Sequence, residues 1–201
     1  MLIQSLSPNR NSGKSISGPS TALELKNILL ALKKESIAGI VLDLRNNNSA
    51  QMQQLNAVVG LFLEGGPFFQ YRHNSDELES QPIETIVPAD FINQQALVVM
   101  TNYANLGVSE ILSAALQDYQ RAVVVGYPTY GLGDGSIMPS LSEGYMLMAG
   151  YEGFRVTGQS MKDGGVTPDV RFAFEHCNIN RKLAFDESSA SSHKQTKNIS
   201  P

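Results

Sequence analysis

The chain has 201 residues, of which 42% are hydrophobic and 17% are charged, a smaller charged share than the roughly 25% of typical globular proteins. This composition favours one ordinary domain with a sizeable core and excludes a coiled coil or a chain without a core. The net charge of −4, from 15 basic and 19 acidic residues, gives no electrostatic argument for binding nucleic acid or an anionic membrane surface.

Short apolar runs rich in β-branched residues alternate along the chain with segments whose apolar residues recur at helical spacing. The clearest apolar run, 38–45, stops at the turn-prone polar cluster 46–49. The clearest helical pattern, 21–35, carries Lys33 and Lys34 near its C-terminal end, where the helix dipole favours cations. We expect strands at 2–6, 38–45, 68–72, 96–101 and 122–126, helices at 21–35, 52–62 and 108–119, and a hairpin formed by 145–149 and 154–156.

Strands that alternate with helices of about a dozen residues predict an α/β domain with substantial parallel pairing. We expect this domain to span residues 1–175, with 1–20 as an entering strand and loop. The polar, acidic segment 73–88 is expected to lie on the surface. Residues 176–201 are expected to be a C-terminal extension, in which the Ser/Lys/Asn-rich segment 188–201 is disordered.

The sequence carries no pattern of a secretory signal or a membrane span. Polar residues at 8–11 interrupt the N-terminus, and no apolar run approaches the ~20 residues that a membrane span needs. As written, the chain is expected to be soluble and to carry no targeting signal. The alternative is that it is a piece of an exported precursor. The single cysteine, Cys177, excludes an internal disulfide, and no Cys/His spacing resembles a zinc site, so neither a metal nor a cofactor is expected.

Several residues of reactive or ligand-binding types have simpler interpretations. The glycine-rich segment 129–136 lacks the spacing and the lysine of a phosphate-binding loop, so a tight turn is the favoured interpretation. His73, His176 and His193 have no Ser or Cys motif beside them, which leaves a Ser-His-Asp triad as a minor alternative. Cys177 lacks an activating turn and is expected to be an idle thiol.

Two acidic residues are also best interpreted as structural. Asp43 lies in a buried strand beside Arg45, which predicts a salt bridge or a loop-anchoring hydrogen bond at the strand end. Glu110 lies at the start of a predicted helix, where a negative charge complements the helix dipole. Neither position requires a catalytic role.

Four blocks of sequence, in order and over residues 24–171, together resemble the catalytic domain of the C-terminal processing (tail-specific) serine peptidases. The blocks are GIVLDLRNN at 39–47, ALVVM at 96–100 followed by the run from VSEIL at 108–112 to Gly126, PTYG at 128–131, and GGVTPD at 164–169. This resemblance implies a ClpP/crotonase-like α/β domain built of repeated strand-strand-helix units. It also implies exported proteins that carry a PDZ domain, cut near apolar C-termini, and use a serine nucleophile with a lysine base.

The positions that carry the family's chemistry are occupied by other residues in this chain. By the resemblance, the nucleophile falls on Gly107, the lysine base on Leu132, and the polar residue that supports the lysine on Ser136. Glycine has no side chain that can attack, and leucine cannot accept a proton. The resemblance therefore implies a member that lacks the catalytic Ser and Lys.

The resemblance assigns the region of the oxyanion hole to Ser49, Ala50 and Val108. A relocated nucleophile remains an alternative, with Ser109 or Ser136 as the candidates. Two residues along a helix turn a side chain by roughly 200°, so Ser109 is expected to point away from the position of residue 107.

The primary hypothesis is a catalytically impaired homologue that binds a peptide or a protein C-terminal segment, with no nucleic acid and no membrane insertion. The first alternative is a serine hydrolase with a relocated nucleophile. The second is a structural module of a larger protein. The family resemblance implies a periplasmic or extracytoplasmic location if the chain is cut from a larger precursor.

Overall fold

A parallel four-stranded sheet, sheet A, carries the apolar runs that the sequence predicts as buried strands. The computed structural model describes residues 21–48, 52–73, 77–83, 95–137, 149–162 and 164–172. Sheet A has the order β1 (Gly39–Asp43), β4 (Ala96–Thr101), β5 (Val123–Gly126) and β8 (Val170–Arg171). The carboxyl ends of these strands therefore meet at one edge, as in other parallel sheets.

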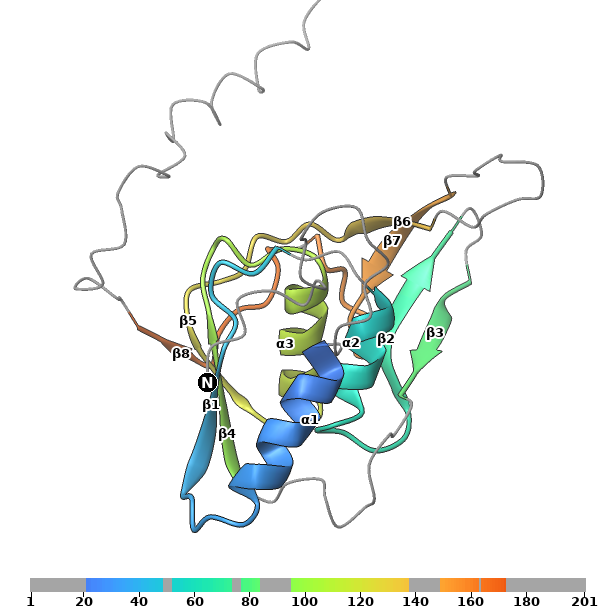
Figure 1. The fold of residues 1–201 in the computed structure, drawn as a ribbon. Coiled ribbons are helices and arrows are strands. Elements are labelled where there is room, and N and C mark those ends of the chain that lie inside the picture. The colour runs from blue at the N-terminus through green and yellow to red at the C-terminus, as the bar shows by residue number, and fades with distance from the viewer. Residues whose placement is uncertain are drawn as a thin grey trace, which may run out of the picture.

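The two faces of β4 differ in burial because successive side chains of a strand point to opposite sides. Leu97, Val99 and Thr101 are buried, whereas Val98 and Met100 on the other face are only partly buried. The run reads as continuously apolar because both faces carry apolar side chains, as is usual for parallel strands. Leu97 and Val99 belong to the same core cluster as buried residues of the helices, so the core lies on the side of sheet A that the helices cover (Figure 1).

Sheet B is a second, antiparallel sheet that the sequence patterns do not predict as a unit. Its order is β3 (Glu79–Pro82), β2 (Pro67–Arg72), β7 (Ala149–Phe154) and β6 (Asp134–Ile137). The three helices lie between the two sheets (Figure 1). They are α1 (Thr21–Leu32), α2 (Met52–Val59) and α3 (Val108–Asp118).

Helix α3 is the most deeply buried of these elements and contacts both sheets, through β5 of sheet A and β2 of sheet B. Every residue from Val108 to Leu116 is buried. A helix that is covered on all sides has a fixed axis and a fixed rotation. Its N-terminus, at the carboxyl edge of sheet A, is therefore a rigid support for a site.

The predicted α/β class and the parallel pairing are confirmed, and several elements differ in detail, among them the second helix, which ends at Val59 instead of residue 62. The first helix ends at Leu32, because the polar residues 33–36 form a turn instead of a further helical turn. The segment 73–88 includes the strand β3. Residues 149–154 form one continuous strand, β7, that pairs with β6 and β2, so the chain does not turn back at 150–153 as the predicted hairpin requires. Residues 145–148 of that hairpin lie outside the described residues. Residues 134–136 of the expected glycine-rich turn belong to β6.

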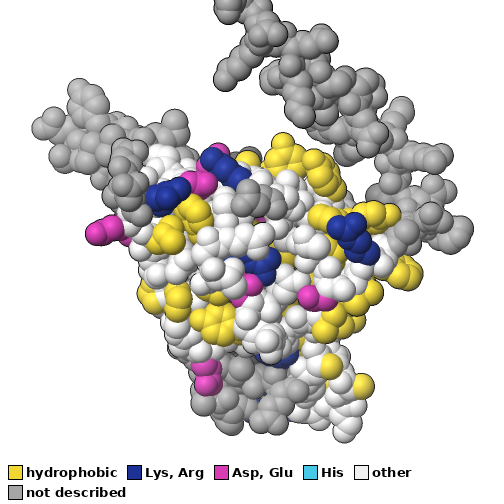
Figure 2. Space-filling view, turned by 180° about the vertical axis from the view of Figure 1, so that it is seen from behind, with side chains coloured by type: hydrophobic (Ala, Val, Ile, Leu, Met, Phe, Trp, Pro, Cys, Tyr) yellow, Lys and Arg dark blue, Asp and Glu magenta, His cyan; other side chains and the backbone are white. Residues whose placement is uncertain are grey.

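Several predicted segments lie outside the described residues, namely 1–20, 49–51, parts of 73–88 (74–76 and 84–88), and the C-terminal extension 176–201. Within the described ranges, no helix has the length and apolar character needed to cross a membrane. The same ranges contain no cluster of three or more His, Cys, Asp or Glu side chains that could hold a metal ion. On the back of the molecule, hydrophobic side chains form several separate groups among charged and other side chains (Figure 2).

Candidate functional site

The loop between β4 and α3 turns sharply so that Gly107 stands at the head of the helix. Gly107 is the N-cap residue of α3, with φ of 68° and ψ of −122°. Residues with a side chain rarely adopt this backbone conformation. A strained turn from a strand into a helix is also how some hydrolases expose a nucleophile at the end of a sheet.

The buried carboxylate of Glu110 joins this turn to the β5–β6 loop. Oε1 accepts hydrogen bonds from the hydroxyl of Thr129 at 2.7 Å and from the N–H of Gly131 at 2.6 Å. Oε2 accepts from the N–H groups of Gly107 at 3.0 Å and Leu132 at 3.2 Å. Glu110 is 1% exposed, and these four donors compensate for burying its charge.

The sequence reading of Glu110 as a partner of the helix dipole missed most of this role. Glu110 stands three residues after the N-cap, and its bond to the N–H of Gly107 is one half of a capping box. That half has a local sequence signal. The bonds to the β5–β6 loop have none, because they join residues that only the fold brings together.

Thr129 extends the connection from Glu110 to the loop before β8. Its hydroxyl donates to Glu110, accepts from the N–H of Val166 at 2.9 Å, and its own N–H donates to the carbonyl of Val166 at 3.2 Å. Gly165 packs directly against Thr129 and Gly131, since a Cβ at residue 165 would lie 2.9 Å from the backbone nitrogen of Gly131. The GGVTPD block therefore supports the same corner of the molecule as Glu110.

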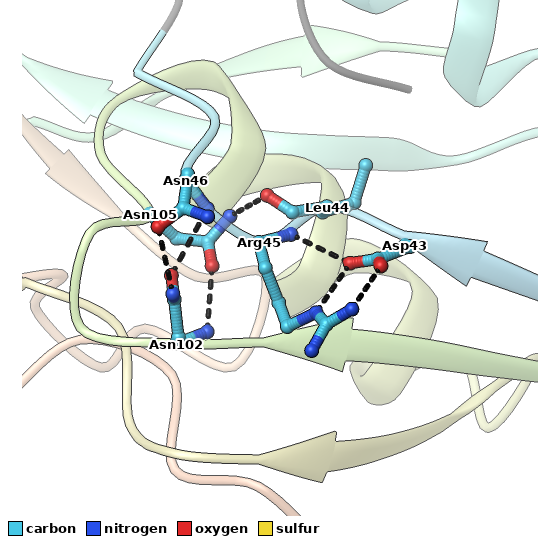
Figure 3. A network of polar contacts seen from close by, with 6 residues as sticks. All are labelled: Asp43, Leu44, Arg45, Asn46, Asn102 and Asn105. Atoms are coloured by element: carbon cyan, nitrogen blue, oxygen red, sulfur yellow. Dashed lines mark hydrogen bonds and ion pairs between the residues drawn. The ribbon is translucent and has the colours of Figure 1, made fainter. Parts of the chain in front are cut away.

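A set of asparagines holds the β4–α3 loop against the end of β1 (Figure 3). The fully buried Asn105 donates from Nδ2 to the carbonyl of Leu44, and its Oδ1 accepts from the N–H of Asn102 at 2.7 Å. The side chain of Asn102 accepts from the N–H of Asn46 and donates to the side chain of Asn46, each at 3.0 Å. These bonds fix both loops at the carboxyl edge of sheet A.

Asp43 and Arg45 form the ion pair that the sequence predicts at the end of β1 (Figure 3). Nε of Arg45 donates to Oδ1 of Asp43 at 2.8 Å, and Nη2 donates to Oδ2 at 2.5 Å. Burial alone would raise the pKa of Asp43, but the hydrogen bonds and charge of Arg45 outweigh burial and hold this pKa below its ordinary value. The pair therefore stabilises the strand end as two opposite charges.

Of the two candidate relocated nucleophiles, Ser109 is fully buried and hydrogen-bonded. Its Oγ donates to the carbonyl of Asn47 at 2.7 Å and accepts from Nδ2 of Asn105 at 3.3 Å. Ser136 lies on β6, where its backbone pairs with Gly150. The fold therefore separates these two serines: Ser109 lies in the first turn of α3 and Ser136 lies on sheet B.

The position of Leu132 lies beside a lysine that the sequence analysis did not single out. Leu132 is 37% exposed. Its neighbour Gly133 packs against Lys162, whose backbone nitrogen would lie 2.5 Å from a Cβ at residue 133. Nζ of Lys162 binds Oδ1 of Asp134 at 2.8 Å. This hydrogen bond raises the pKa of Lys162, which keeps the amine charged and unsuited to act as a base.

The remaining sequence candidates are Val108 next to Gly107, His73 on sheet B, and residues outside the described ranges. Val108, assigned to the oxyanion region, is the first residue of α3, where an N–H has no acceptor within its own helix. His73 follows β2 on sheet B, with Nδ1 3.0 Å from the carbonyl oxygen of Gly150. The other assigned residues, Ser49, Ala50, His176, His193 and Cys177, lie outside the described residues.

Comparisons with known proteins agree with the sequence resemblance. The model of peptidase family S41 matches residues 10–172. The chain is 28% identical to the tail-specific protease of Haemophilus influenzae, over 88% of this chain and 27% of that protein. It is 26% identical to the carboxy-terminal-processing protease of Bartonella bacilliformis, over 73% of this chain and 33% of that protein. The chain thus spans about a third or less of these relatives.

Solved structures support the same fold. The photosystem II D1 C-terminal processing protease superposes with a TM-score of 0.67 and 23% identity, over 85% of this chain and 41% of that one. Mature CPAF complexed with lactacystin superposes with a TM-score of 0.64 and 15% identity, over 85% of this chain and 46% of that one. The expected fold of the C-terminal processing peptidases is therefore confirmed.

Proposed function

Because this chain belongs to peptidase family S41, we propose that it is a non-catalytic member whose domain binds an extended peptide or the C-terminal segment of a protein. The curated relatives are named as tail-specific or carboxy-terminal-processing proteases. A protein or peptide is accordingly the class of partner that a domain of this fold is built to hold.

One observation carries the proposal: a single oxygen of Glu110 accepts from the N–H groups of both Gly107 and Leu132. These are the residues that the family resemblance assigns to the nucleophile and to its base. Under this assignment, one carboxylate oxygen holds the backbone of both positions, while the two residues lack a hydroxyl and an amine. Retaining this scaffold without the reactive groups favours binding over catalysis.

The surroundings offer no replacement among the described residues. A nucleophile must be accessible and must have a base within hydrogen-bond reach. Ser109 is fully buried and bonded to Asn47, which supports a structural role for its hydroxyl. Lys162 is paired with Asp134 and stays charged, so it does not supply the missing base.

The test compares the wild-type domain with variants that restore the lost groups. Wild type, Gly107→Ser/Leu132→Lys, and the same variant with Ser136→Gln are incubated with a peptide library bearing apolar C-termini, and new termini are identified by mass spectrometry. Binding of the same library is measured in parallel by fluorescence anisotropy. We expect wild type to bind peptides without cutting them, and the restored variants to cut at a consistent position.

The matched control is Gly107→Ala/Leu132→Lys, which has the same backbone strain at residue 107 but no hydroxyl. Cleavage by the serine variants and not by this control assigns the activity to residue 107. Cleavage by the wild-type protein would overturn the proposal of a non-catalytic domain. Failure of the wild-type protein to bind any peptide would overturn the proposed binding function.

A further inference from the structure

Two exposed tyrosines stand together on the two loops that meet at Glu110. Tyr103 lies on the β4–α3 loop and is 63% exposed, and Tyr130 lies on the β5–β6 loop and is 51% exposed. Their ring centroids are 5.5 Å apart with the planes at 62°, an edge-to-face contact. The two rings are thus in contact with each other while much of each remains open to solvent.

The backbone beneath the rings is fixed on both sides. The N–H of Tyr130 donates to the carbonyl of Asn105 at 3.1 Å, and the next N–H, of Gly131, donates to Glu110. On the other loop, the N–H of Asn102 donates to Oδ1 of Asn105 at 2.7 Å. Aromatic side chains on a fixed backbone lose little conformational entropy when a ligand is bound, which makes them efficient contact residues.

The two loops that carry the pair are uncharged, and the charges of Lys162 and Asp134, which lie beside Gly133, compensate each other in an ion pair. Residues 102–108 and 127–133, which make up the two loops, contain no Asp, Glu, Lys or Arg. The ion pair at the adjacent end of β1 is formed by Asp43 and Arg45, whose charges compensate each other. Leu132 adds a partly exposed apolar side chain on the same loop as Tyr130. An uncharged, apolar group complements this surface better than an acidic or a basic one.

We propose that Tyr103 and Tyr130 together select one large apolar side chain of the bound peptide. This inference rests on the proposed peptide-binding function and adds the residues that determine its specificity. Tyrosines are enriched among the residues that carry most of the binding energy in interfaces, especially where they lie on a rigid support. The occupant is an uncharged, extended peptide segment whose apolar side chain packs on the two rings.

The experiment uses an array of uncharged ten-residue peptides in which one Leu or Phe is scanned through a Ser/Ala host sequence. Matched peptides carry Ala, Lys or Asp at the scanned position. Binding is measured for wild type, Tyr103→Ala, Tyr130→Ala, the double variant, and Tyr130→Phe. The control is Tyr127→Ala, because Tyr127 lies on the same loop, is 46% exposed, and is not in the ring contact.

We expect wild type to prefer Leu or Phe over Ala, Lys and Asp at one position of the host peptide. Each alanine variant at the pair should weaken that binding about tenfold, the usual scale for an aromatic contact residue. The double variant should lose less than the product of the two single losses, because the rings act as a unit. Tyr130→Phe and Tyr127→Ala should bind as wild type does. Circular dichroism checks that each variant is folded.

The outcomes separate this inference from the proposed function. If wild type binds peptides and the tyrosine variants bind them equally well, the specificity role is wrong and peptide binding stands. If wild type prefers Lys at the scanned position, the rings bind a cation, and the proposed selection of an apolar side chain is wrong. If wild type binds no peptide of the array or of the library with apolar C-termini, both the function and the inference fail.

Discussion

The carboxylate of Glu110 accepts a hydrogen bond from the backbone N–H of Leu132, 22 residues further along the chain. The same oxygen accepts from the N–H of Gly107, so the head of α3 and the β5–β6 loop share one acceptor. The geometry of the corner thus depends on a buried charge whose partners are mostly backbone groups. Such an arrangement tolerates a change of the side chain at 132 far better than a change of residue 110.

Glu110→Gln should destabilise the domain although it is nearly isosteric. The amide keeps one acceptor oxygen but directs an NH₂ group at N–H donors, which leaves buried donors without a partner. We expect the free energy of unfolding to fall by about 2–4 kcal/mol. Urea denaturation measures this, with the exposed Glu35→Gln as the control. Equal stability of the two variants would contradict the role given to Glu110.

Ser109→Ala tests whether the buried hydroxyl is structural. Its loss removes a donor from the carbonyl of Asn47, which keeps the N–H of Leu106 as a partner, so we expect a loss of about 1 kcal/mol. Ser113→Ala is the matched control, because Ser113 is equally buried and its hydroxyl donates to the carbonyl of Ser109 within the same helix. That change should stay within about 0.5 kcal/mol in urea denaturation. If wild type cuts peptides and Ser109→Ala abolishes the activity, the structural interpretation is wrong.

The neighbours Gly164 and Gly165 should respond differently to the same substitution. Both have positive φ, at 81° and 65°, but a Cβ at Gly164 meets no atom within 4 Å, whereas one at Gly165 meets Thr129 and the nitrogen of Gly131 at 2.9 Å. We expect Gly164→Ala to cost about 1 kcal/mol for the backbone alone. Gly165→Ala should cost about 3 kcal/mol or more, because it also displaces Thr129. Thermal and urea unfolding of the two variants would show whether the difference exists.

The pair of Asp43 and Arg45 predicts a loss of stability at acidic pH. The pKa of Asp43 is lowered in the folded state, so the folded protein holds this carboxyl deprotonated more readily than the unfolded chain does. Its contribution is therefore fully present above the unfolded pKa of about 3.9 and is lost as the pH falls through the folded value. Urea denaturation from pH 7 to pH 3 should show the stability advantage of wild type over Asp43→Asn shrinking only below about pH 4. An advantage independent of pH would argue against an ionised pair.

The sequence predicted three of the four strands of sheet A, β1, β4 and β5, because each is a short apolar run that stands out from its surroundings. It did not predict β8, which is only two exposed residues long. Ala96–Thr101 is predicted to the residue, and the buried helix Val108–Asp118 differs from its prediction by one residue. Sheet B was not predicted as a unit because strands such as Glu79–Pro82 and Asp134–Ile137 are short and largely polar. Their strand geometry comes from pairing with β2 and β7, which no local pattern reveals.

The candidate site, like the fold, could be predicted from the sequence only in part. Motifs in the sequence point to the turn at Gly107 and to the loop of Leu132, and the pair of Asp43 and Arg45 follows from their adjacency in a strand. The contacts that make these loops one corner, from Glu110 to the β5–β6 loop and between Tyr103 and Tyr130, are long-range and involve backbone groups or exposed rings. Side-chain types alone carry no information about such contacts.

The link from Thr129 to Val166 also sets an order of events during synthesis of the chain. Thr129 can hold Glu110 and Val166 together only after the GGVTPD block has left the ribosome, and the N–H of Val124 can donate to Oδ2 of Asp169 only at the same stage. Contacts between distant parts of a chain form late and slow the folding of a domain. The corner that surrounds Gly107 therefore cannot be completed before residues 164–169 are available, and a shorter nascent chain exposes it unfinished.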